Sequence, residues 1–123
     1  MTIGYFNAVA RATRTPASQF ARLFMVPAME HCAGGAGVDQ FGADAGDPPI
    51  VDARHDMLVA MERWLDGGPA PETFIARRVE AGRIVKQRPR YVYPRVERYR
   101  GTGSPDAASS FECGPPGRLA ATR

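Results

Sequence analysis

The sequence predicts the α/β fold class on three observations. Residues 23–26 form a short apolar run of the length of a buried strand, and Pro27 stops it because proline cannot donate to a sheet ladder. Residues 51–65 have the apolar spacing of an amphipathic helix. Two β-prone runs, 73–79 and 83–87, surround a glycine turn and predict a hairpin. These elements are too few for a free-standing sheet, so we expect the end of a larger α/β fold.

The composition is that of one soluble globular domain. The 123 residues are 44% hydrophobic and 24% charged, which is ordinary for such a protein. No apolar run approaches the roughly 20 residues that a membrane helix needs, so no membrane partner is expected. Residues 1–10 lack the basic start and apolar core of a secretory signal. The chain is therefore expected in the cytoplasm if it is made as given, unless its true N-terminus lies upstream.

The N-terminal part is expected to hold a helix, a strand and a long loop. Apolar residues at helical spacing predict a short amphipathic helix over residues 4–13, which the loop at 15–18 ends. The strand is expected over residues 20–26. Residues 33–49 are rich in Gly, Asp and Pro, which predicts a surface loop with little regular structure.

The helix over residues 51–65 is the clearest element. Asp52 suits the positive end of the helix dipole, while Asp47 could instead cap an earlier turn. Gly67 is free to take the left-handed conformation that ends a helix. His55 lies away from the apolar stripe and is interpreted as a solvated helix residue. The stripe itself is predicted to be buried and consists of Met57, Leu58, Met61, Trp64 and Leu65.

The C-terminal part is expected to consist of the hairpin, a short extended segment and a tail. Arg88 and Pro89 are predicted to break the hairpin, and residues 91–94 are predicted to be extended. Residues 101–104 have the composition of a turn, and residues 114–123 that of a disordered tail.

His31 is the candidate catalytic residue. A lone histidine after a strand is more often structural than catalytic, but this one lies between a strand stop and a loop with glycines at positions 34, 35 and 37. Such a loop lets the backbone approach a substrate closely, and a general base needs a positioned, partly exposed imidazole. The hypothesis is that His31 is the general base of a serine esterase. A metal site is disfavoured, because His31, Cys32 and Cys113 are only three candidate ligands and adjacent His-Cys is not a usual zinc spacing.

No nucleophile can be named among these residues. None of the serines stands in the G-x-S-x-G pattern of a nucleophile elbow. The glycines after His31 match neither common phosphate-binding pattern. The serines are Ser18, Ser104, Ser109 and Ser110.

The net charge of +3 conceals a strong asymmetry. Residues 1–76 carry five basic and nine acidic groups, whereas residues 77–100 carry nine basic and two acidic groups. The basic block from Arg77 to Arg100, with interleaved tyrosines, is compatible with a nucleic-acid-binding module. The favoured interpretation is a solvated hairpin face whose arginines balance the acidic N-terminal part, so no nucleic-acid partner is favoured.

Residues 20–35, FARLFMVPAMEHCAGG, resemble the C-terminal catalytic segment of the tannase and feruloyl esterase family. The family pattern there is close to R-L-F-M-V-P-G-M-x-H-C-x-G-G-x-G-P. Residues 58–71 are similar to the family's L-x-x-W-[VL]-x-x-G-x-A-P helix and its exit. Residues 88–94 are similar to R-P-L-C-P-Y-P, and residues 99–113 to Y-K-G-[ST]-G-[SD]-x-x-D-A-A-x-F-x-C. The similarity covers roughly residues 18–113.

The resemblance implies the C-terminal part of an α/β-hydrolase, with a triad in chain order Ser, Asp, His. His31 matches the histidine of that triad. Cys32 matches a cysteine that, in the family, forms a disulfide with one beside the nucleophile. The serine, the aspartate, the oxyanion hole and the substrate lid would all come from upstream sequence absent here. The carboxylates after the histidine are excluded as the triad acid by chain order; they are Asp39, Asp44, Asp47 and Asp52.

Three positions depart from the family pattern. Ala28 replaces a glycine, and Val38 replaces a proline. Tyr91 stands where the family has the cysteine that precedes Cys113, so Cys113 is expected to have lost its partner. Cys32 is expected to be unpaired as well if the chain starts at Met1. A Cys32–Cys113 disulfide stays open but has no support in the family pattern.

The sequence therefore predicts a carboxylic ester hydrolase segment over residues 1–113, followed by the tail. The resemblance implies esters of phenolic acids as substrates, an acyl-serine mechanism, no cofactor and no metal. It implies secreted or periplasmic full-length relatives, and a segment inactive on its own. Two alternatives remain: the basic nucleic-acid-binding module, and a non-catalytic remnant that folds poorly.

Overall fold

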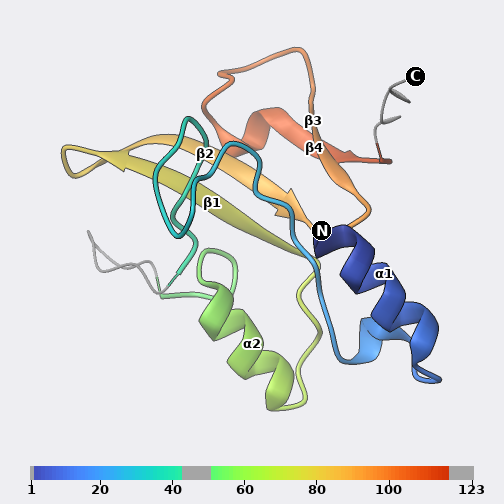
Figure 1. Cartoon of the computed structure of the whole chain (residues 1–123). Coiled ribbons are helices and arrows are strands. Elements are labelled where there is room, and N and C mark those ends of the chain that lie inside the picture. The colour runs from blue at the N-terminus through green and yellow to red at the C-terminus, as the bar shows by residue number, and fades with distance from the viewer. Residues whose placement is uncertain (1, 43–50, 117–123) are drawn as a thin grey trace, which may run out of the picture.

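The computed structural model describes residues 2–42 and 51–116. A long hairpin of β1 and β2 lies in the middle, with α2 on one side and the short two-stranded sheet of β3 and β4 on the other (Figure 1). Both sheets have two antiparallel strands, ordered β1-β2 and β3-β4. The elements are α1 (Thr2–Ala12), η1 (Ala17–Gln19), α2 (Met57–Leu65), β1 (Thr73–Glu80), β2 (Arg83–Tyr91), β3 (Val96–Tyr99), η2 (Ala108–Ser110) and β4 (Phe111–Gly114).

The β1-β2 hairpin confirms the two predicted strands and their glycine turn. Ala81 and Gly82 form the turn, both with positive φ angles, of 49° and 73°. The prediction that Arg88 and Pro89 break the hairpin was wrong, because β2 continues to Tyr91. Pro89 pairs with Ile75, whose N–H instead donates to the carbonyl of Arg54 at 2.7 Å. The missing proline N–H therefore leaves no ladder bond unmade at this pair.

The core is small and lies on one face of β1. Phe74 is 1% exposed, and its ring lies 4.9 Å from that of Phe24 and 5.3 Å from that of Phe41. Val38 and Ala76 are fully buried beside it. The core thus joins β1 to two segments that lie more than 30 positions earlier in the chain.

The helix predicted over residues 51–65 begins only at Met57. Asp56 has extended φ and ψ, and its carboxylate accepts hydrogen bonds from the N–H groups of Leu58 and Val59, so it is the N-cap. Asp52 caps a separate turn instead, since it accepts from the N–H groups of Arg54 and His55. Gly67 has a φ of 86° and ends the helix as predicted.

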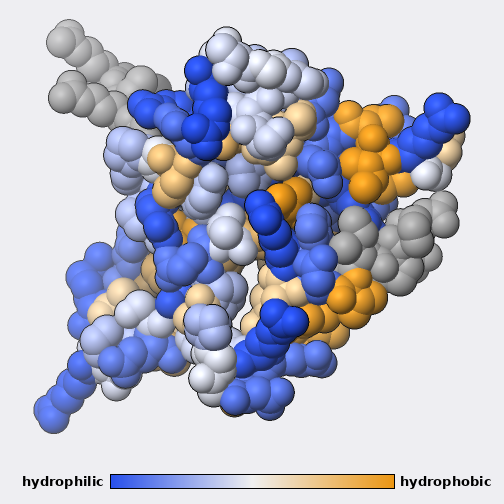
Figure 2. Space-filling model, turned by 180° about the vertical axis from the view of Figure 1, so that it is seen from behind, coloured by the Kyte–Doolittle hydropathy of each residue, from blue (hydrophilic) through white to orange (hydrophobic). Residues whose placement is uncertain are grey.

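Most of the stripe predicted to be buried on α2 is exposed. Leu58 is 54% exposed, Met61 51% and Leu65 79%, and only Ala60 of the helix is buried. Figure 2 shows hydrophobic side chains gathered over α2 and over the free end of the β1-β2 hairpin. The helical period was predicted correctly, and Trp64 is covered by the guanidinium of Arg22, which lies 5.2 Å from the ring centre. The other stripe residues remain exposed among the described residues.

Two further predictions in the N-terminal part had different outcomes. The helix over residues 4–13 is confirmed as α1. The strand over residues 20–26 is wrong: Phe24 makes one antiparallel bridge to Val92, and Tyr93 donates to the carbonyl of Leu23. The pairing stops there because the chain turns at Tyr93 and Pro94. The prediction that residues 91–94 are extended is therefore wrong at its last two positions.

The last predictions concern loops and the tail. Residues 101–104 form the predicted bend, whereas Gly114 belongs to β4 and not to a tail. Residues 33–42 follow the predicted irregular loop, with two isolated bridges. Residues 43–50, which include Asp44 and Asp47, and residues 117–123 lie outside the described residues. No helix in the described ranges is long and apolar enough to cross a membrane.

Candidate active site

His31 lies at the tip of a tight loop that spans residues 27–37. The loop folds back on itself through a bridge between Met29 and Gly35, and Gly37 donates to the carbonyl of Ala28 at 2.9 Å. Gly35 has a φ of 85°, and a Cβ there would lie 2.3 Å from the carbonyl oxygen of Ala28. Only glycine fits this position, so the glycine-rich sequence after His31 is required by the shape of the loop.

Ala28 adopts a conformation that favours glycine. Its φ is 61°, in the left-handed region where an alanine Cβ is strained by roughly 1–2 kcal/mol. This is the position at which the sequence departs from the glycine of the family pattern. The loop therefore keeps its turn at Ala28 despite the substitution.

The 27–37 loop is fixed to the face of β1. Arg78 donates from one guanidinium nitrogen to the carbonyls of Gly35 and Gly37, the second at 3.1 Å. Just after the loop, Arg77 and Gln40 exchange backbone hydrogen bonds of 2.8 and 2.9 Å. Together with buried Val38, these contacts attach both the side chain and the backbone of β1 to the loop that carries His31.

His31 and Cys32 are brought together, and both are exposed. Cys32 Sγ lies 3.0 Å from His31 Nδ1, and Cys32 has a positive φ of 71°. Among the described residues, no carboxylate lies within ion-pair distance of the His31 ring. Asp39 instead accepts a hydrogen bond of 2.8 Å from the N–H of Gly34 and supports the loop. The loop presents an imidazole outward, without a triad acid of its own.

The two cysteines have different neighbours. Cys113 and Tyr91 interact electrostatically and contribute to a raised pKa of the Tyr91 phenol, for which burial is the larger cause. Tyr91, which stands where the resemblance expects a cysteine partner, is therefore near enough to Cys113 for an electrostatic interaction. Both Cys32 and Cys113 are free and exposed, so no Cys32–Cys113 disulfide exists in the structure. In the described part of the chain, no group of three metal-ligating side chains comes together.

Both thiols are expected to react with a thiol reagent without denaturant. Titration of the folded chain with 5,5′-dithiobis(2-nitrobenzoate) should release about two equivalents of thiolate per chain, because both cysteines are free and exposed. A Cys32→Ser variant should release about one. If the untreated chain releases none and releases two only after reduction, the two cysteines form a disulfide and the arrangement described here is wrong.

His55 is not the solvated helix residue that its position in the sequence indicated. It lies in the turn before α2, its side chain is only 22% exposed, and its Nδ1 is 2.9 Å from Asp52 Oδ1. Partial burial alone would raise the pKa of Asp52, but hydrogen bonds from the His55 ring and the Arg54 N–H outweigh it and lower that pKa. The spacing Asp-x-x-His, which fits one turn, was the signal available in the sequence.

The basic block differs in part from the predicted solvated face. Arg77 and Arg90 are 5% and 3% exposed, and burial lowers the pKa of Arg90, although Glu97 opposes this. The ion-pair partners come mostly from residues 80–112 and not from the acidic N-terminal part. The pairs are Arg78–Glu80, Arg88–Asp106, Arg90–Glu97, Arg95–Glu72, Arg98–Glu112 and Arg100–Glu112.

Comparison with known proteins decides the family. The family model for tannase and feruloyl esterase matches residues 1–114, which include the His31 loop, α2 and both sheets. The chain belongs to this family. The resemblance seen in the sequence over roughly residues 18–113 is thereby confirmed.

Curated family relatives of this tannase and feruloyl esterase segment include two bacterial proteins. An uncharacterised esterase of Xanthomonas campestris pv. campestris is 43% identical over 100 residues, which cover 77% of this chain and 17% of that protein. The mono(2-hydroxyethyl) terephthalate hydrolase of Piscinibacter sakaiensis is 33% identical over 118 residues, covering 94% of this chain and 17% of that protein.

A solved structure confirms the predicted fold. Feruloyl esterase B from Aspergillus oryzae superposes with a TM-score of 0.81 at 26% identity, covering 92% of this chain and 23% of that one. The described residues thus have the fold of the corresponding part of an esterase of the α/β-hydrolase type. The chain spans about a sixth to a quarter of the length of these relatives.

Proposed function

We propose that this chain provides the catalytic histidine of a carboxylic ester hydrolase. The observation that carries the proposal is the exposed imidazole of His31, held on a loop fixed to β1 in a chain of the tannase and feruloyl esterase family. An imidazole held in this way is what general-base catalysis requires. The serine nucleophile and the triad aspartate belong to a segment beyond these residues.

In the proposed reaction His31 first takes up a proton and then releases it in each of two steps, the formation and the hydrolysis of the acyl-serine. It takes the proton of the serine hydroxyl while the serine oxygen attacks the ester carbonyl, and then protonates the leaving alcohol. It next takes a proton from the water that attacks the acyl-serine, and returns that proton to the serine oxygen when the acid leaves. Esters of phenolic acids such as ferulate or gallate are the proposed substrates, and this chemistry needs no cofactor.

Cys32 is proposed to form a disulfide with a cysteine beside the nucleophile in the complete enzyme. Its thiol is free, exposed and adjacent to the imidazole, so a bridge there would hold the nucleophile's segment against His31. A disulfide of this kind requires an oxidising compartment, which agrees with a secreted or periplasmic enzyme.

A chimera tests this function. Residues 1–114 replace the homologous C-terminal segment of the Xanthomonas campestris esterase, and the purified product is assayed with methyl ferulate and methyl gallate. We expect ester hydrolysis by the chimera and none by the 123-residue chain alone, because the chain holds no nucleophile elbow. Serine-dependent turnover by the chain alone, or an inactive chimera that is folded, would contradict the proposal.

A further inference from the structure

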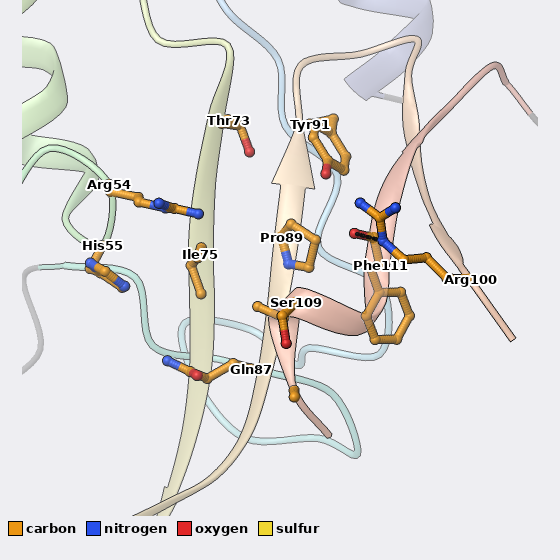
Figure 3. A pocket seen from close by; sticks show the side chains of 12 residues that line it. Arg54, His55, Thr73, Ile75, Gln87, Pro89, Tyr91, Arg100, Ser109 and Phe111 are labelled. Carbon is orange, nitrogen blue, oxygen red and sulfur yellow. Dashed lines mark hydrogen bonds between the residues drawn. The ribbon is translucent and has the colours of Figure 1, made fainter. Parts of the chain in front are cut away.

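A second candidate site lies on the face of the β1-β2 hairpin. A pocket of about 540 Å³ opens there between the turn that precedes α2 and the segment formed by η2 and β4 (Figure 3). Its volume is within the range of small-molecule sites, roughly 300–1,000 Å³. None of the residues that line it belongs to the 27–37 loop, so the proposed role of His31 does not use this pocket.

Among the described residues, the pocket is lined by positive charge and by no carboxylate. Arg54 and Arg100 reach into it from opposite sides, and Figure 3 shows their guanidinium groups directed toward the space between them. Arg54 makes no ion pair with any residue in the described ranges. Arg100 is oriented by hydrogen bonds to the carbonyl of Phe111, at 3.2 Å, and to Glu112, at 3.3 Å. At least one guanidinium is therefore available to an anionic ligand.

Part of the pocket wall is apolar and packed against neighbouring side chains. Pro89 and Ile75, side by side in the β1-β2 register, are buried and form part of the lining. Phe111 contacts both Arg88 and Tyr99. The guanidinium carbon of Arg88 lies 4.4 Å from the centre of the Phe111 ring, and the ring centres of Tyr99 and Phe111 are 5.5 Å apart. These surfaces offer an apolar face to a flat ring.

Tyr91 adds a hydrogen-bond donor to this wall. Its phenol points into the pocket, and burial together with the nearby Cys113 thiol raises its pKa. Because the ordinary value is already near 10, the phenol remains protonated at neutral pH. It can therefore donate to an anionic oxygen beside either arginine.

We propose that this pocket binds an aromatic carboxylate, with the carboxylate on Arg54 or Arg100 and the ring against Pro89 and Phe111. A planar guanidinium pairs with a carboxylate through two parallel hydrogen bonds, which gives orientation as well as affinity. The apolar wall selects a ring over a simple anion. Ferulate is a suitable probe because it is an acid product of the proposed hydrolysis. Only this choice of probe rests on the proposed function, since the binding itself requires no turnover.

The test is a titration of the complete 123-residue chain, followed by backbone amide NMR shifts and by calorimetry. Benzoate and ferulate are compared with acetate, benzyl alcohol and inorganic phosphate. We expect saturable shifts at Arg54, Tyr91 and Phe111 with the two aromatic acids, and affinities at least about tenfold weaker for the three comparison compounds. Equal binding of acetate or phosphate, or no shifts at these residues, would overturn the proposal.

Variants separate this site from non-specific attraction. Of Arg54→Gln and Arg100→Gln, the variant at the arginine that holds the carboxylate should weaken benzoate binding by about tenfold, since it removes a charge-assisted hydrogen bond. Unchanged affinity in both variants would overturn the proposal. Arg83→Gln is the matched control, because it removes the same charge from the exposed first residue of β2, outside the pocket lining, and should leave the affinity unchanged. A loss as large in Arg83→Gln would show general attraction to a basic surface. His31→Ala should bind benzoate like the parent, so failure of ester hydrolysis and failure of this site are distinguishable.

Discussion

Replacing His31 by alanine in the chimera is expected to lower kcat for methyl ferulate by roughly 10⁴-fold to 10⁶-fold, with KM changed little. The reason is that loss of the base leaves only binding and oxyanion stabilisation to accelerate the reaction. The exposed side chain of His31 makes no contact with the core, so thermal unfolding of the chimera should be unchanged. The measurement is steady-state kinetics with methyl ferulate.

The matched control for His31→Ala is Glu30→Gln in the same chimera. Glu30 precedes the histidine on the same loop and exposes its side chain to solvent. Its replacement should change kcat by no more than about threefold. A His31→Ala enzyme that keeps a tenth or more of the parent kcat would exclude His31 as the general base.

Phe74→Ala is expected to lower the free energy of unfolding of the chain by about 3–5 kcal/mol. Phe74 is 1% exposed and packs between two other aromatic rings, so its truncation removes buried area and leaves a cavity in the small core. Urea unfolding followed by the fluorescence of Trp64 and by circular dichroism measures the change. Phe74→Leu should cost less, which keeps the test informative if the alanine variant is unfolded.

Tyr5→Ala is the control for the core. Tyr5 is 73% exposed on α1, and its truncation should change the free energy of unfolding by less than about 0.5 kcal/mol. Cooperative unfolding of the parent, with equal effects of Phe74→Ala and Tyr5→Ala, would place the core elsewhere. An absence of any cooperative transition would support the alternative that the chain is a remnant that folds poorly.

Local signals in the sequence predicted the hairpin and missed the start of the helix. The glycine at position 82 set the β1-β2 turn, and the conformational freedom of glycine is a property that a sequence shows directly. The start of α2 depended on which of two aspartates caps it. Asp52 and Asp56 are chemically equivalent candidates, and the folded backbone distinguishes them, because it is extended at Asp56 and directs the N–H groups of Leu58 and Val59 to that carboxylate.

The candidate site was predicted only where its residues form a local pattern in the sequence. His31 and its glycine loop form a local pattern, so the sequence revealed them. The contact of Arg78 with Gly35 joins residues 43 positions apart, and no local pattern contains it. The pocket could not be predicted for the same reason, since Arg54 and Arg100 both line it only through the packing of separate elements.

The attachment of the His31 loop to β1 sets the smallest unit that can be transplanted between esterases. A graft of residues 23–42 alone would separate the carbonyls of Gly35 and Gly37 from Arg78, the arginine of this chain that holds them. A graft that carries β1 without β2 would lose the strand pairing that positions Arg78, which lies at the register shift of the hairpin. Exchange of His31, the proposed catalytic residue, between homologous enzymes is therefore expected to preserve the loop when residues 23–42 and 73–91 are moved together.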